Sequence, residues 1–356
     1  MEIGIVGLPN VGKSSLFNAL TAAGVASENF PFTTIEPNIG VVPVKDPRLD
    51  VLEKMYSAPK KVPAAIRFLD IAGLVPGASK GEGRGNDFLD DIRSVDAIAQ
   101  VVRCFDDANV INVMGDLNPR KDAEVISMEL ILADLGQTEK LIEKYRGPAK
   151  AGNEEAKKNF EFLDAIRKNL ENGIPLRRQN LPAALVKPLN FLTSKPVLYI
   201  ANTNEKTPAS VVDIVRDYAK QEGGDVVEIN NKLEADVMML PEEERPAFRK
   251  ELGIKESGLD ALAHAGQKLL NLISFFAAGP KEVHAWHITK GSPVPQAAGK
   301  IHSDLERGFI RAEVFSYNDL VEAGSEAGLR AKGKIRMEGK DYITQDGDIL
   351  HIHFKV

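Results

Sequence analysis

The chain has 356 residues, enough for two or three domains, and its 43% hydrophobic and 27% charged content is typical of a soluble globular protein. A formal net charge of −6 argues against wholesale coating by nucleic acid, so an RNA or DNA partner would need a local basic patch. The single cysteine, Cys104, excludes an internal disulfide and a cysteine-rich metal site. The same single cysteine fits a reducing cytoplasm. No apolar run is long enough to cross a bilayer, so we expect no membrane partner. We also expect no DNA specificity.

The first motif lies at residues 7–14, which read Gly-Leu-Pro-Asn-Val-Gly-Lys-Ser and fit the phosphate-binding pattern G-x-x-x-x-G-K-S/T. The apolar run at 1–6 predicts a buried strand before the motif, and residues 15–20 predict a helix after it. Strand, glycine loop and helix are the context that the motif requires. A glycine-rich turn that binds nothing is the alternative, and the agreement of all these features argues against it.

The residue types in this loop suit a polyphosphate. Gly7 and Gly12 let backbone N–H groups turn inward, and the N-terminus of the following helix adds partial positive charge. Lys13 would reach the β- and γ-phosphates of a nucleotide, and the Ser14 hydroxyl would bind Mg²⁺. The loop therefore predicts a nucleoside triphosphate site.

Residues 28–37 contain two prolines and two adjacent threonines, which predicts an extended loop. A P-loop switch protein needs a second hydroxyl here to complete the Mg²⁺ shell and sense the γ-phosphate. Thr34 is the candidate, and Thr33 is the neighbour most easily confused with it. The alternative is a threonine pair in a plain surface loop, but its place between the P-loop and a strand predicted at 39–44 favours the switch.

A strand predicted at 65–70 ends in an acid, and the residues from Asp70 to Gly73 fit D-x-x-G. Asp70 would hold Mg²⁺ through a water, and the Gly73 amide would donate to the γ-phosphate. The pattern is weak alone but strong after an apolar strand downstream of a P-loop. Leu74 follows, where many signalling GTPases carry a water-orienting glutamine. Because leucine cannot form hydrogen bonds through its side chain, catalysis must use another group, a backbone contact or a partner.

The glycine-rich, charged stretch at 76–86 directly follows D-x-x-G, which favours a second switch loop over a plain linker. A further strand is predicted at 97–105. It contains Cys104, around which there is no nucleophile signature, so we interpret this cysteine as core packing.

From Asn118 the composition changes to that of paired helices. A four-three-four-three spacing predicts a heptad seam with one polar position, made of Ile131, Leu135, Thr138, Ile142 and Tyr145. We expect Gly147, Pro148 and Gly152 to break this helix, and a second amphipathic helix to follow around 163–170. The result would be an antiparallel αα-hairpin. Two interpretations of this hairpin are nearly even: it is an element that packs within the protein, or it is an arm that projects toward a partner.

The strand predicted at 197–201 is followed by Asn202-Thr203-Asn204-Glu205. In a GTPase fold the loop after this strand reads the base, and its guanine-specific form is N-K-x-D. The aspartate there accepts hydrogen bonds from guanine N1–H and the 2-amino group. Thr203 replaces the lysine and Glu205 the aspartate, and adenine has neither donor, so the loop favours ATP over GTP. A polar loop with no role in base choice is the alternative.

A last strand of this domain is predicted at 226–229, and the residues from Asn230 to Lys232 should border the base. Residues 241–251 predict a charged helix start, and an apolar-periodic helix over 259–276 is expected to close the domain.

From Gly279 a separate unit with its own apolar core begins, and short strands with glycine turns predict a small mixed α/β domain. Eight lysines and arginines between residues 300 and 340 make it locally basic, which indicates either a solvated surface or an RNA or ribosome contact. Its histidines lack the spacing of a metal site. His351 and His353 alternate along one strand face and are interpreted as structural.

Four stretches together resemble one family: residues 7–15, 29–38, 70–78 and 295–304. On these motifs the sequence is identified as a member of the Obg-like ATPase (YchF) family of TRAFAC P-loop NTPases, a resemblance that runs essentially end to end. It implies an α/β fold with a Ras-like P-loop NTPase (G-type) domain at 1–117 and 196–278. It also implies an inserted helical coiled-coil arm at 118–195 and a C-terminal TGS domain of β-grasp type at 279–356.

The resemblance also implies roles for individual residues. Phosphate binding falls to Asn10, Val11, Gly12, Lys13, Ser14 and Ser15. The Mg²⁺ residues are Ser14, Thr34 and Asp70, and Lys13 and Gly73 are the catalytic candidates. On the base side the candidates are Asn202, Thr203, Glu205 and Asn230, with Thr203 using its backbone. In related P-loop proteins an asparagine at the position of Asn10 binds K⁺, so K⁺ is a candidate second cation.

The implied function is a Mg²⁺-dependent ATPase switch with slow intrinsic turnover that a partner accelerates. The family's association with ribosomes indicates the large ribosomal subunit as that partner, with RNA contacts through the TGS domain and the helical arm. One alternative is a GTPase with relaxed base recognition, since Asn230 and Asn231 stand where relatives usually have small residues. The other is a nucleotide-gated module that docks to the ribosome or RNA and hydrolyses nucleotide only incidentally.

Overall fold

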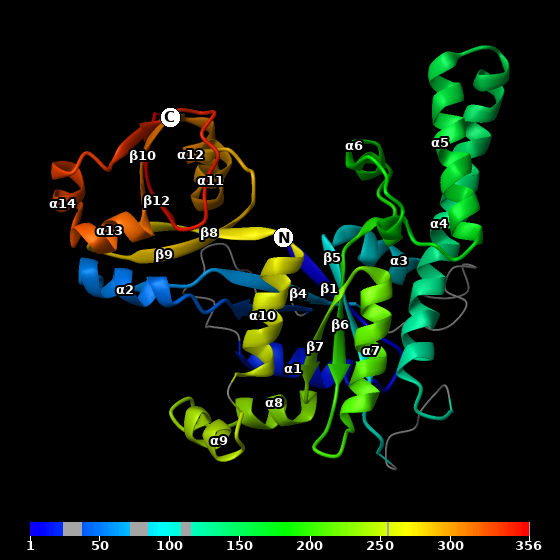
Figure 1. Ribbon diagram of the computed structural model, residues 1–356, viewed down its shortest axis with the longest axis horizontal. Helices are drawn as coiled ribbons and strands as arrows, with labels where there is room; N and C mark the ends of the chain where they lie inside the picture. Colours follow the sequence, from blue (N-terminus) through cyan, green and yellow to red (C-terminus); the bar gives the residue numbers. More distant parts are fainter. Residues whose placement is uncertain (24–37, 72–84, 108–114, 255, 356) are drawn as a thin grey trace. The chain divides into compact units, whose positions relative to one another are not determined.

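The computed structural model describes residues 1–23, 38–71, 85–107, 115–254 and 256–355. These form two compact units (Figure 1). Unit 1 contains the described residues of 1–23, 38–40 and 67–265, and unit 2 contains those of 41–66 and 266–355. The three-part domain division expected from the sequence stays a prediction.

Unit 1 is organised around a sheet with the strand order β2-β4-β1-β5-β6-β7. The strands are β1 (Glu2–Val6), β2 (Ile39–Pro43), β4 (Ala65–Asp70), β5 (Ala97–Arg103), β6 (Val197–Asn202) and β7 (Asp225–Ile229). All four pairs from β4 to β7 are parallel, so the carboxyl ends of these five strands lie at one edge. Every residue of β5 and β6 is buried, as expected for continuous apolar runs covered on both faces. All six strands were predicted from the sequence to within about two residues.

Helices surround this sheet. They are α1 (Lys13–Ala23), α3 (Gly85–Ser94), α7 (Ala209–Glu222), α8 (Asn231–Met238), α9 (Arg245–Glu251) and α10 (Gly258–Leu269). The helix predicted over 259–276 is wrong beyond Leu269, because strand β8 (Leu272–Ala278) follows. Asn271 adopts a positive φ of 50° between the two elements, which ends the helix. A short apolar run that is buried on both faces has no period that separates a strand from a helix.

The helical arm begins with α4 (Pro119–Lys150) and α5 (Glu154–Glu171), which lie side by side in Figure 1. Asn118 caps α4, with its side chain accepting from the Lys121 amide at 3.0 Å. The break expected at Gly147 and Pro148 is wrong, because α4 continues through both to Lys150. The turn comes at Gly152, whose φ of 89° suits glycine. The chain returns through η3 (Leu176–Arg178), α6 (Ala183–Val186), η4 (Lys187–Leu189) and η5 (Leu192–Ser194).

The predicted heptad seam is confirmed in the core of the arm. Ile131 and Ile142 of α4 pack in one cluster with Leu163, Ile166 and Leu170 of α5, and Leu135 and Tyr145 lie against it. The polar seam position, Thr138, is fully buried and donates from Oγ1 to the Asp134 carbonyl at 2.7 Å. An intrahelical bond therefore satisfies the one hydroxyl in the seam.

Unit 2 contains a mixed sheet with the order β11-β10-β12-β8-β9-β3. Its elements are α2 (Pro47–Tyr56), β3 (Lys61–Val62), β8, β9 (Val283–Thr289), α11 (Val294–Ile301), α12 (Ser303–Arg307), β10 (Phe309–Ser316), α13 (Tyr317–Ala323), α14 (Glu326–Ala331), β11 (Arg336–Glu338) and β12 (Asp348–Phe354). The mixed α/β type predicted for the C-terminal part is confirmed.

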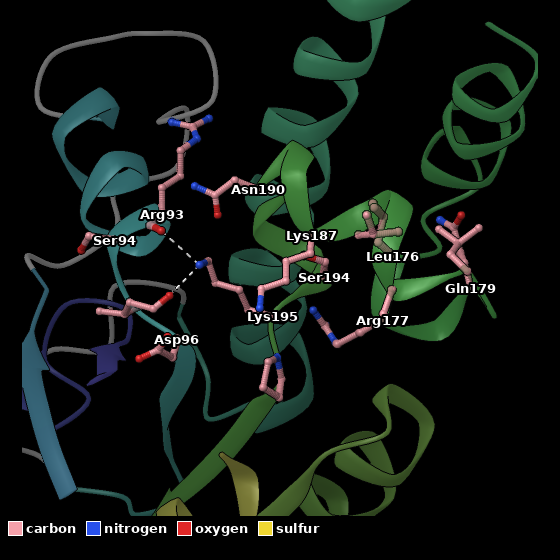
Figure 2. A pocket seen from close by; sticks show the side chains of 15 residues that line it. Arg93, Ser94, Asp96, Leu176, Arg177, Gln179, Lys187, Asn190, Ser194 and Lys195 are labelled. Carbon is pink, nitrogen blue, oxygen red and sulfur yellow. Dashed lines mark hydrogen bonds between the residues drawn. The ribbon is translucent and has the colours of Figure 1, made fainter. Parts of the chain in front are cut away.

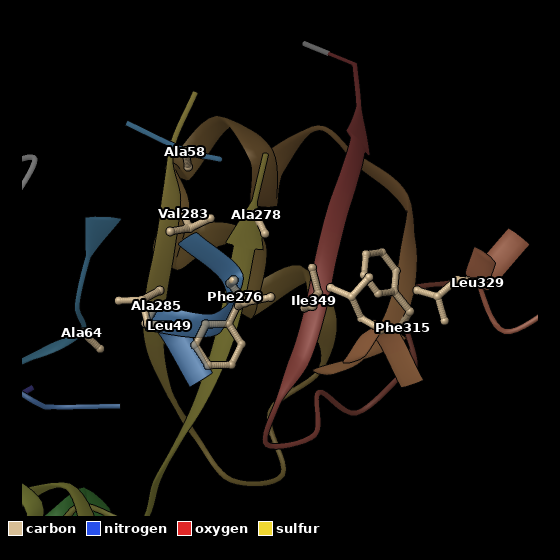
Figure 3. Packing of buried hydrophobic residues seen from close by; sticks show 12 residues of the cluster. Leu49, Ala58, Ala64, Phe276, Ala278, Val283, Ala285, Phe315, Leu329 and Ile349 are labelled. Carbon is tan, nitrogen blue, oxygen red and sulfur yellow. The ribbon is translucent and has the colours of Figure 1, made fainter. Parts of the chain in front are cut away.

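The core of unit 2 is not made by the C-terminal residues alone. Leu49 and Leu52 of α2 are buried in one cluster with Phe276, Phe315 and Ile349 (Figure 3). In addition, β3 pairs with β9 in parallel. The segment 41–66 therefore supplies both a helix and an edge strand to a unit that otherwise lies more than 200 residues further along the chain.

One smaller expectation is also met, that for Cys104. Cys104 is 1% exposed, and burial raises the pKa of its thiol to about 12, so it is an unreactive core residue. His351 and His353 lie on β12 near Glu326 and Glu313, at 3.5 and 3.6 Å. Among the described residues, no helix combines the length and the apolar character needed to span a membrane.

Candidate functional site

A cleft of about 1010 Å³ lies in unit 1, at the edge of the sheet where parallel strands end. Segments that follow β1, β5, β6 and β7 line it. They contribute Leu8, Pro9, Asn10, Gly12, Lys13, Ser14, Ser15, Phe105, Asp106, Asp107, Asn202, Thr203, Asn204, Glu205, Lys206, Asn230, Asn231, Lys232, Leu233 and Asp236. Because a parallel sheet brings the carboxyl ends of its strands together, motifs from four distant stretches meet in one cleft.

The glycine loop has the backbone that phosphate binding requires. Asn10 and Gly12 have φ angles of +63° and +92°, the left-handed backbone that anion-binding concavities of backbone amides contain. A Cβ at Gly12 would lie 2.1 Å from the Asn202 Nδ2 atom, so no larger residue fits there. The loop then enters α1, where the Leu16 amide donates to the Gly12 carbonyl at 3.1 Å.

Lys13 and Asp70, predicted from separate motifs, lie together. The Lys13 ammonium is 3.4 Å from Asp70 Oδ1 and donates to the Ile71 carbonyl at 2.5 Å. Its side chain is 13% exposed, so this cation is held at the carboxyl end of β4. Among the described residues, no group donates a hydrogen bond to the buried Asp70 Oδ1 atom.

Two asparagines form hydrogen bonds with backbone carbonyls of the glycine loop. The Asn202 carboxamide donates to the Val11 carbonyl at 2.8 Å and accepts from the Asn231 amide at 3.2 Å. The Asn231 side chain donates to the Gly12 carbonyl at 3.2 Å. Asn202 is 4% exposed and Asn231 is fully buried, so these bonds form away from water. The end of β6 and the start of α8 thus hold the phosphate loop in place.

Sequence reasoning placed Asn202 on the base side and gave Asn231 no role in the loop. In the structure the Asn202 side chain is engaged with the loop backbone. The available signal was an asparagine pair, Asn230 and Asn231, directly after a predicted strand. Sequence alone could not show that its second member points at a loop more than 200 residues away.

Hydrogen bonds to the backbone and within the turn fix the loop after β6. Thr203 is 8% exposed and its amide donates to the Ile229 carbonyl at 2.9 Å, which leaves the Thr203 carbonyl for any backbone contact with a base. Asn204 Oδ1 accepts from the Lys206 amide at 3.0 Å and from Thr207 Oγ1 at 3.1 Å. Glu205 is exposed at the cleft. The Glu205 carboxylate therefore lies on a turn that the Asn204 side chain stabilises through hydrogen bonds.

Asn230 lies at the cleft and also caps a helix. Its Oδ1 atom accepts from the Leu233 amide at 3.0 Å at the start of α8. Thr34, Gly73 and Leu74 lie outside the described residues, as do Thr33 and most of the predicted second switch loop. Their predicted roles stay predictions.

Comparisons with family models divide the chain into two matched regions. Residues 2–133 match the family described as "50S ribosome-binding GTPase". Residues 272–355 match the YchF GTPase C-terminal family, described as "Protein of unknown function (DUF933)". The second match begins at β8, where unit 2 resumes its sheet.

Curated relatives cover the whole chain. The chain is 51% identical over 360 residues to "Ribosome-binding ATPase YchF" of Escherichia coli O157:H7, covering 100% of this chain and 99% of the relative. It is 48% identical over 364 residues to the protein of the same name in Bacillus subtilis (strain 168), covering 100% of both.

Solved structures agree with this assignment. The Schizosaccharomyces pombe YchF GTPase matches with a TM-score of 0.88 and 36% identity, covering 99% of this chain and 97% of that chain. A GTP-binding protein from Pyrococcus horikoshii OT3 matches with a TM-score of 0.61 and 20% identity over 100% of both chains, which supports the fold alone.

Proposed function

The chain belongs to the YchF family, and on that premise we propose that it is a ribosome-binding ATPase that works as a nucleotide switch. The observation that carries the proposal is the contact of Lys13 with Asp70 at 3.4 Å, next to Ser14 and a glycine loop with positive φ angles at Asn10 and Gly12. These are the elements that P-loop NTPases use to hold a triphosphate. Because its relatives are named as ribosome-binding, we expect this chain to be cytoplasmic.

Mg²⁺ is the cation that this site suits. Asp70 Oδ1 is buried, accepts no hydrogen bond from a described residue and lies 3.4 Å from the Lys13 ammonium, and Ser14, the next residue after Lys13, lines the cleft. Hard oxygen ligands of this kind match Mg²⁺. Ser14, Asp70 and Thr34 would hold the ion, which when bound neutralises charge on the β- and γ-phosphates. Asn10 is the candidate residue for an additional K⁺.

The proposed reaction is attack of water on the γ-phosphorus in line with the leaving ADP oxygen, giving ADP and inorganic phosphate. The Lys13 ammonium and the loop amides stabilise charge that develops on the phosphoryl oxygens. The Gly73 amide is expected to add a further donor. We assign no general base, and Leu74 cannot orient the water by a side-chain hydrogen bond. Because no group of this chain is assigned to activate the water, we expect slow intrinsic turnover that a partner accelerates.

Base choice is proposed to favour ATP. Glu205 stands where the guanine-specific loop has an aspartate, and adenine offers no N1–H or 2-amino group to a carboxylate. Asn230 and the Thr203 carbonyl are the remaining candidates for base contacts at this end of the cleft.

A GTPase with relaxed base recognition is the second candidate. Glu205 is itself a carboxylate exposed at the cleft, and the family matched by residues 2–133 is described as a GTPase. A longer carboxylate side chain could still accept from guanine.

The ribosomal partner is proposed to be the large subunit. The helical arm and the basic C-terminal residues are the surfaces through which RNA contacts would form, consistent with electrostatic attraction to a phosphate backbone.

Equilibrium binding of labelled ATP and GTP, each with Mg²⁺, tests the proposal. We expect tighter binding of ATP, and at least a tenfold loss for both nucleotides in Lys13→Ala, because a charge-assisted bond to phosphate contributes about 1.5–3 kcal/mol. Tighter binding of GTP would favour the second candidate. Unchanged ATP affinity in Lys13→Ala would overturn the assignment of the loop.

A further inference from the structure

A second cavity of unit 1, of about 530 Å³, lies far from the P-loop cleft. It is bounded by the end of α3, by the residues just before β5 and β6, and by the return segment of the arm. It therefore lies at the amino ends of the strands, whereas the P-loop cleft lies at their carboxyl ends. The seven residues of β5 separate the two edges by roughly 20 Å.

The cavity has an excess of positive charge. Arg93, Arg177, Lys187 and Lys195 line it, and Asp96 is the one carboxylate among its lining residues. Asp96 Oδ2 already accepts from the Glu2 amide at 2.8 Å. Arg93 pairs with Asp90 and Arg177 with Glu222, whereas Lys187 and Lys195 form no ion pair among the described residues, so the local excess of positive charge comes from the two lysines. Such a concentration of charge attracts an anion.

Arg177 is one recessed cation in the wall of the cavity. Its side chain is only 9% exposed, and its terminal nitrogen donates to the Glu222 carboxylate and to Ser127 Oγ. Its Nε atom is buried and has no hydrogen-bond partner among the described residues. A buried guanidinium donor without an acceptor is costly, and the bonds to Glu222 and Ser127 hold this side chain in the wall of the cavity.

Lys195 presents a second recessed cation. Its ammonium donates to the carbonyls of Arg93 and Val95, at 3.1 and 2.5 Å, at the end of α3. An ammonium has three donors, so one remains beyond these two bonds. Burial lowers the Lys195 pKa, and a nearby anion would favour its charged form.

Figure 2 shows how these side chains gather. The nitrogen ends of Lys187 and Arg177, from the return segment, and of Lys195, just before β6, lie along the middle of the view, whereas the Arg93 guanidinium lies apart from them at the top. Among the described residues, no carboxylate forms an ion pair with Lys187, Arg93 pairs with exposed Asp90, and Arg177 is tied to Glu222. Lys187 and Arg93 can therefore turn toward a ligand at low cost.

We propose that this cavity binds a small phosphorylated molecule carrying at least two negative charges, at a site separate from the P-loop. Arginine forks suit phosphate oxygens, and lysines add point charge. The volume falls in the range of small-molecule sites, and Leu181 and Val186 give it an apolar wall for an organic portion of the ligand. A concave site with recessed cations suits a small ligand better than the backbone of a long nucleic acid.

Calorimetric titration with inorganic pyrophosphate tests the site on the full chain, with the P-loop saturated by a non-hydrolysable ATP analogue and Mg²⁺ held constant. We expect one further binding event. Lys187→Ala and Arg93→Gln should each weaken it at least tenfold, because each removes one charged contact. Both residues are outside the nucleotide machinery, so affinity for the ATP analogue should not change, which also reports that the variants are folded.

Lys157→Ala is the matched control, since this lysine is exposed on α5 of the same arm. It should bind pyrophosphate like the unchanged chain. Absence of a second binding event, or equal affinity in Lys187→Ala and Lys157→Ala, would overturn the proposal. It would also be overturned if a twelve-nucleotide oligouridylate, and not pyrophosphate, bound in a Lys187-dependent way, which would assign the cavity to a nucleic acid. None of these readouts depends on hydrolysis or on the preference for ATP over GTP.

Discussion

The asparagines at 202 and 231 show how single buried carboxamides position a loop that itself contacts the ligand. Each side chain bonds to a carbonyl of the P-loop, and the two are joined through the Asn231 amide. Because these side chains bind the loop carbonyls, the loop amides stay available for a ligand in the cleft. The geometry thus links base-side elements to phosphate binding without requiring either side chain to contact the nucleotide.

We predict that Asn231→Ala weakens ATP and GTP binding by the same factor, about three- to tenfold. The substitution removes one buried hydrogen bond to the Gly12 carbonyl, which contributes about 0.5–1.5 kcal/mol, and leaves that carbonyl without its partner. Equilibrium binding of both nucleotides measures the effect.

Asn230→Ser provides the comparison, because serine retains the cap of α8 while it shortens the side chain at the cleft. If Asn231→Ala altered the ratio of ATP to GTP affinity, Asn231 would be a base-reading residue and the bracing role would be wrong.

At the scale of elements, the arm depends on one buried carboxylate. Asp134 of α4 is fully buried and accepts from the Leu192 amide at 2.9 Å, the Thr193 amide at 2.8 Å and Thr193 Oγ1 at 2.7 Å. Burial raises the Asp134 pKa against these hydrogen bonds. The carboxylate joins the long helix to the short η5 turn through which the chain returns to β6.

We predict that Asp134→Asn lowers the free energy of unfolding by about 1–3 kcal/mol. An amide nitrogen would face one of these donors and leave it buried without an acceptor, at about 1–3 kcal/mol for each such group. Chemical denaturation followed by circular dichroism gives the value.

Asp164→Asn on α5 is the matched change, since the Asp164 side chain is 26% exposed and, in the part of the chain that the structure describes, pairs with neighbouring Arg167 and Lys168. It should cost less than about 1 kcal/mol, as surface ion pairs do. Equal destabilisation by the two substitutions would contradict the importance assigned to the buried network.

Elements were predicted well where periodicity was strong. The seam of α4 and the strands of the nucleotide-binding sheet were recovered because they have a clear period or a continuous apolar run between turn signals. The helix extended through 272–276 failed because Phe275 and Phe276 are both fully buried, so that both faces of the strand are apolar. The helix break expected at Pro148 failed because α4 continues through it to Lys150, so that proline there removes one backbone donor without ending the helix.

At the scale of the whole molecule, unit 2 is assembled from distant parts of the chain. Arg48 of α2 pairs with Asp346 at 2.7 Å and lies 5.1 Å from the centre of the Phe276 ring. The same helix buries Leu49 and Leu52 in the shared cluster. Residues 41–66 leave from β2 and return into β4, so two strands of the nucleotide-binding sheet are covalently continuous with unit 2.

We predict that a fragment of residues 279–356 does not unfold cooperatively by itself. It lacks β8 and α2, whose large buried side chains each contribute about 1.5–3 kcal/mol, and a whole domain has only about 5–15 kcal/mol of stability. Thermal unfolding followed by circular dichroism distinguishes a sharp transition from a gradual one.

A fragment that joins 41–66 to 266–356 through a flexible linker should regain a sharp transition. If the shorter fragment already melted cooperatively, the contribution of α2 and β8 to this core would be dispensable.

By itself, the sequence determined the chemistry of the P-loop and D-x-x-G, because those motifs consist of neighbouring residues whose backbone and charge requirements are local. It also determined where the strands of the nucleotide-binding sheet lie along the chain, and which residues form the seam of the arm. Only the tertiary structure decided that Asn231 braces the loop, that 41–66 belongs to the core of unit 2, and that four cations surround one cavity. Those features depend on contacts between residues tens to hundreds of positions apart, and no local pattern records which side chains a fold brings together.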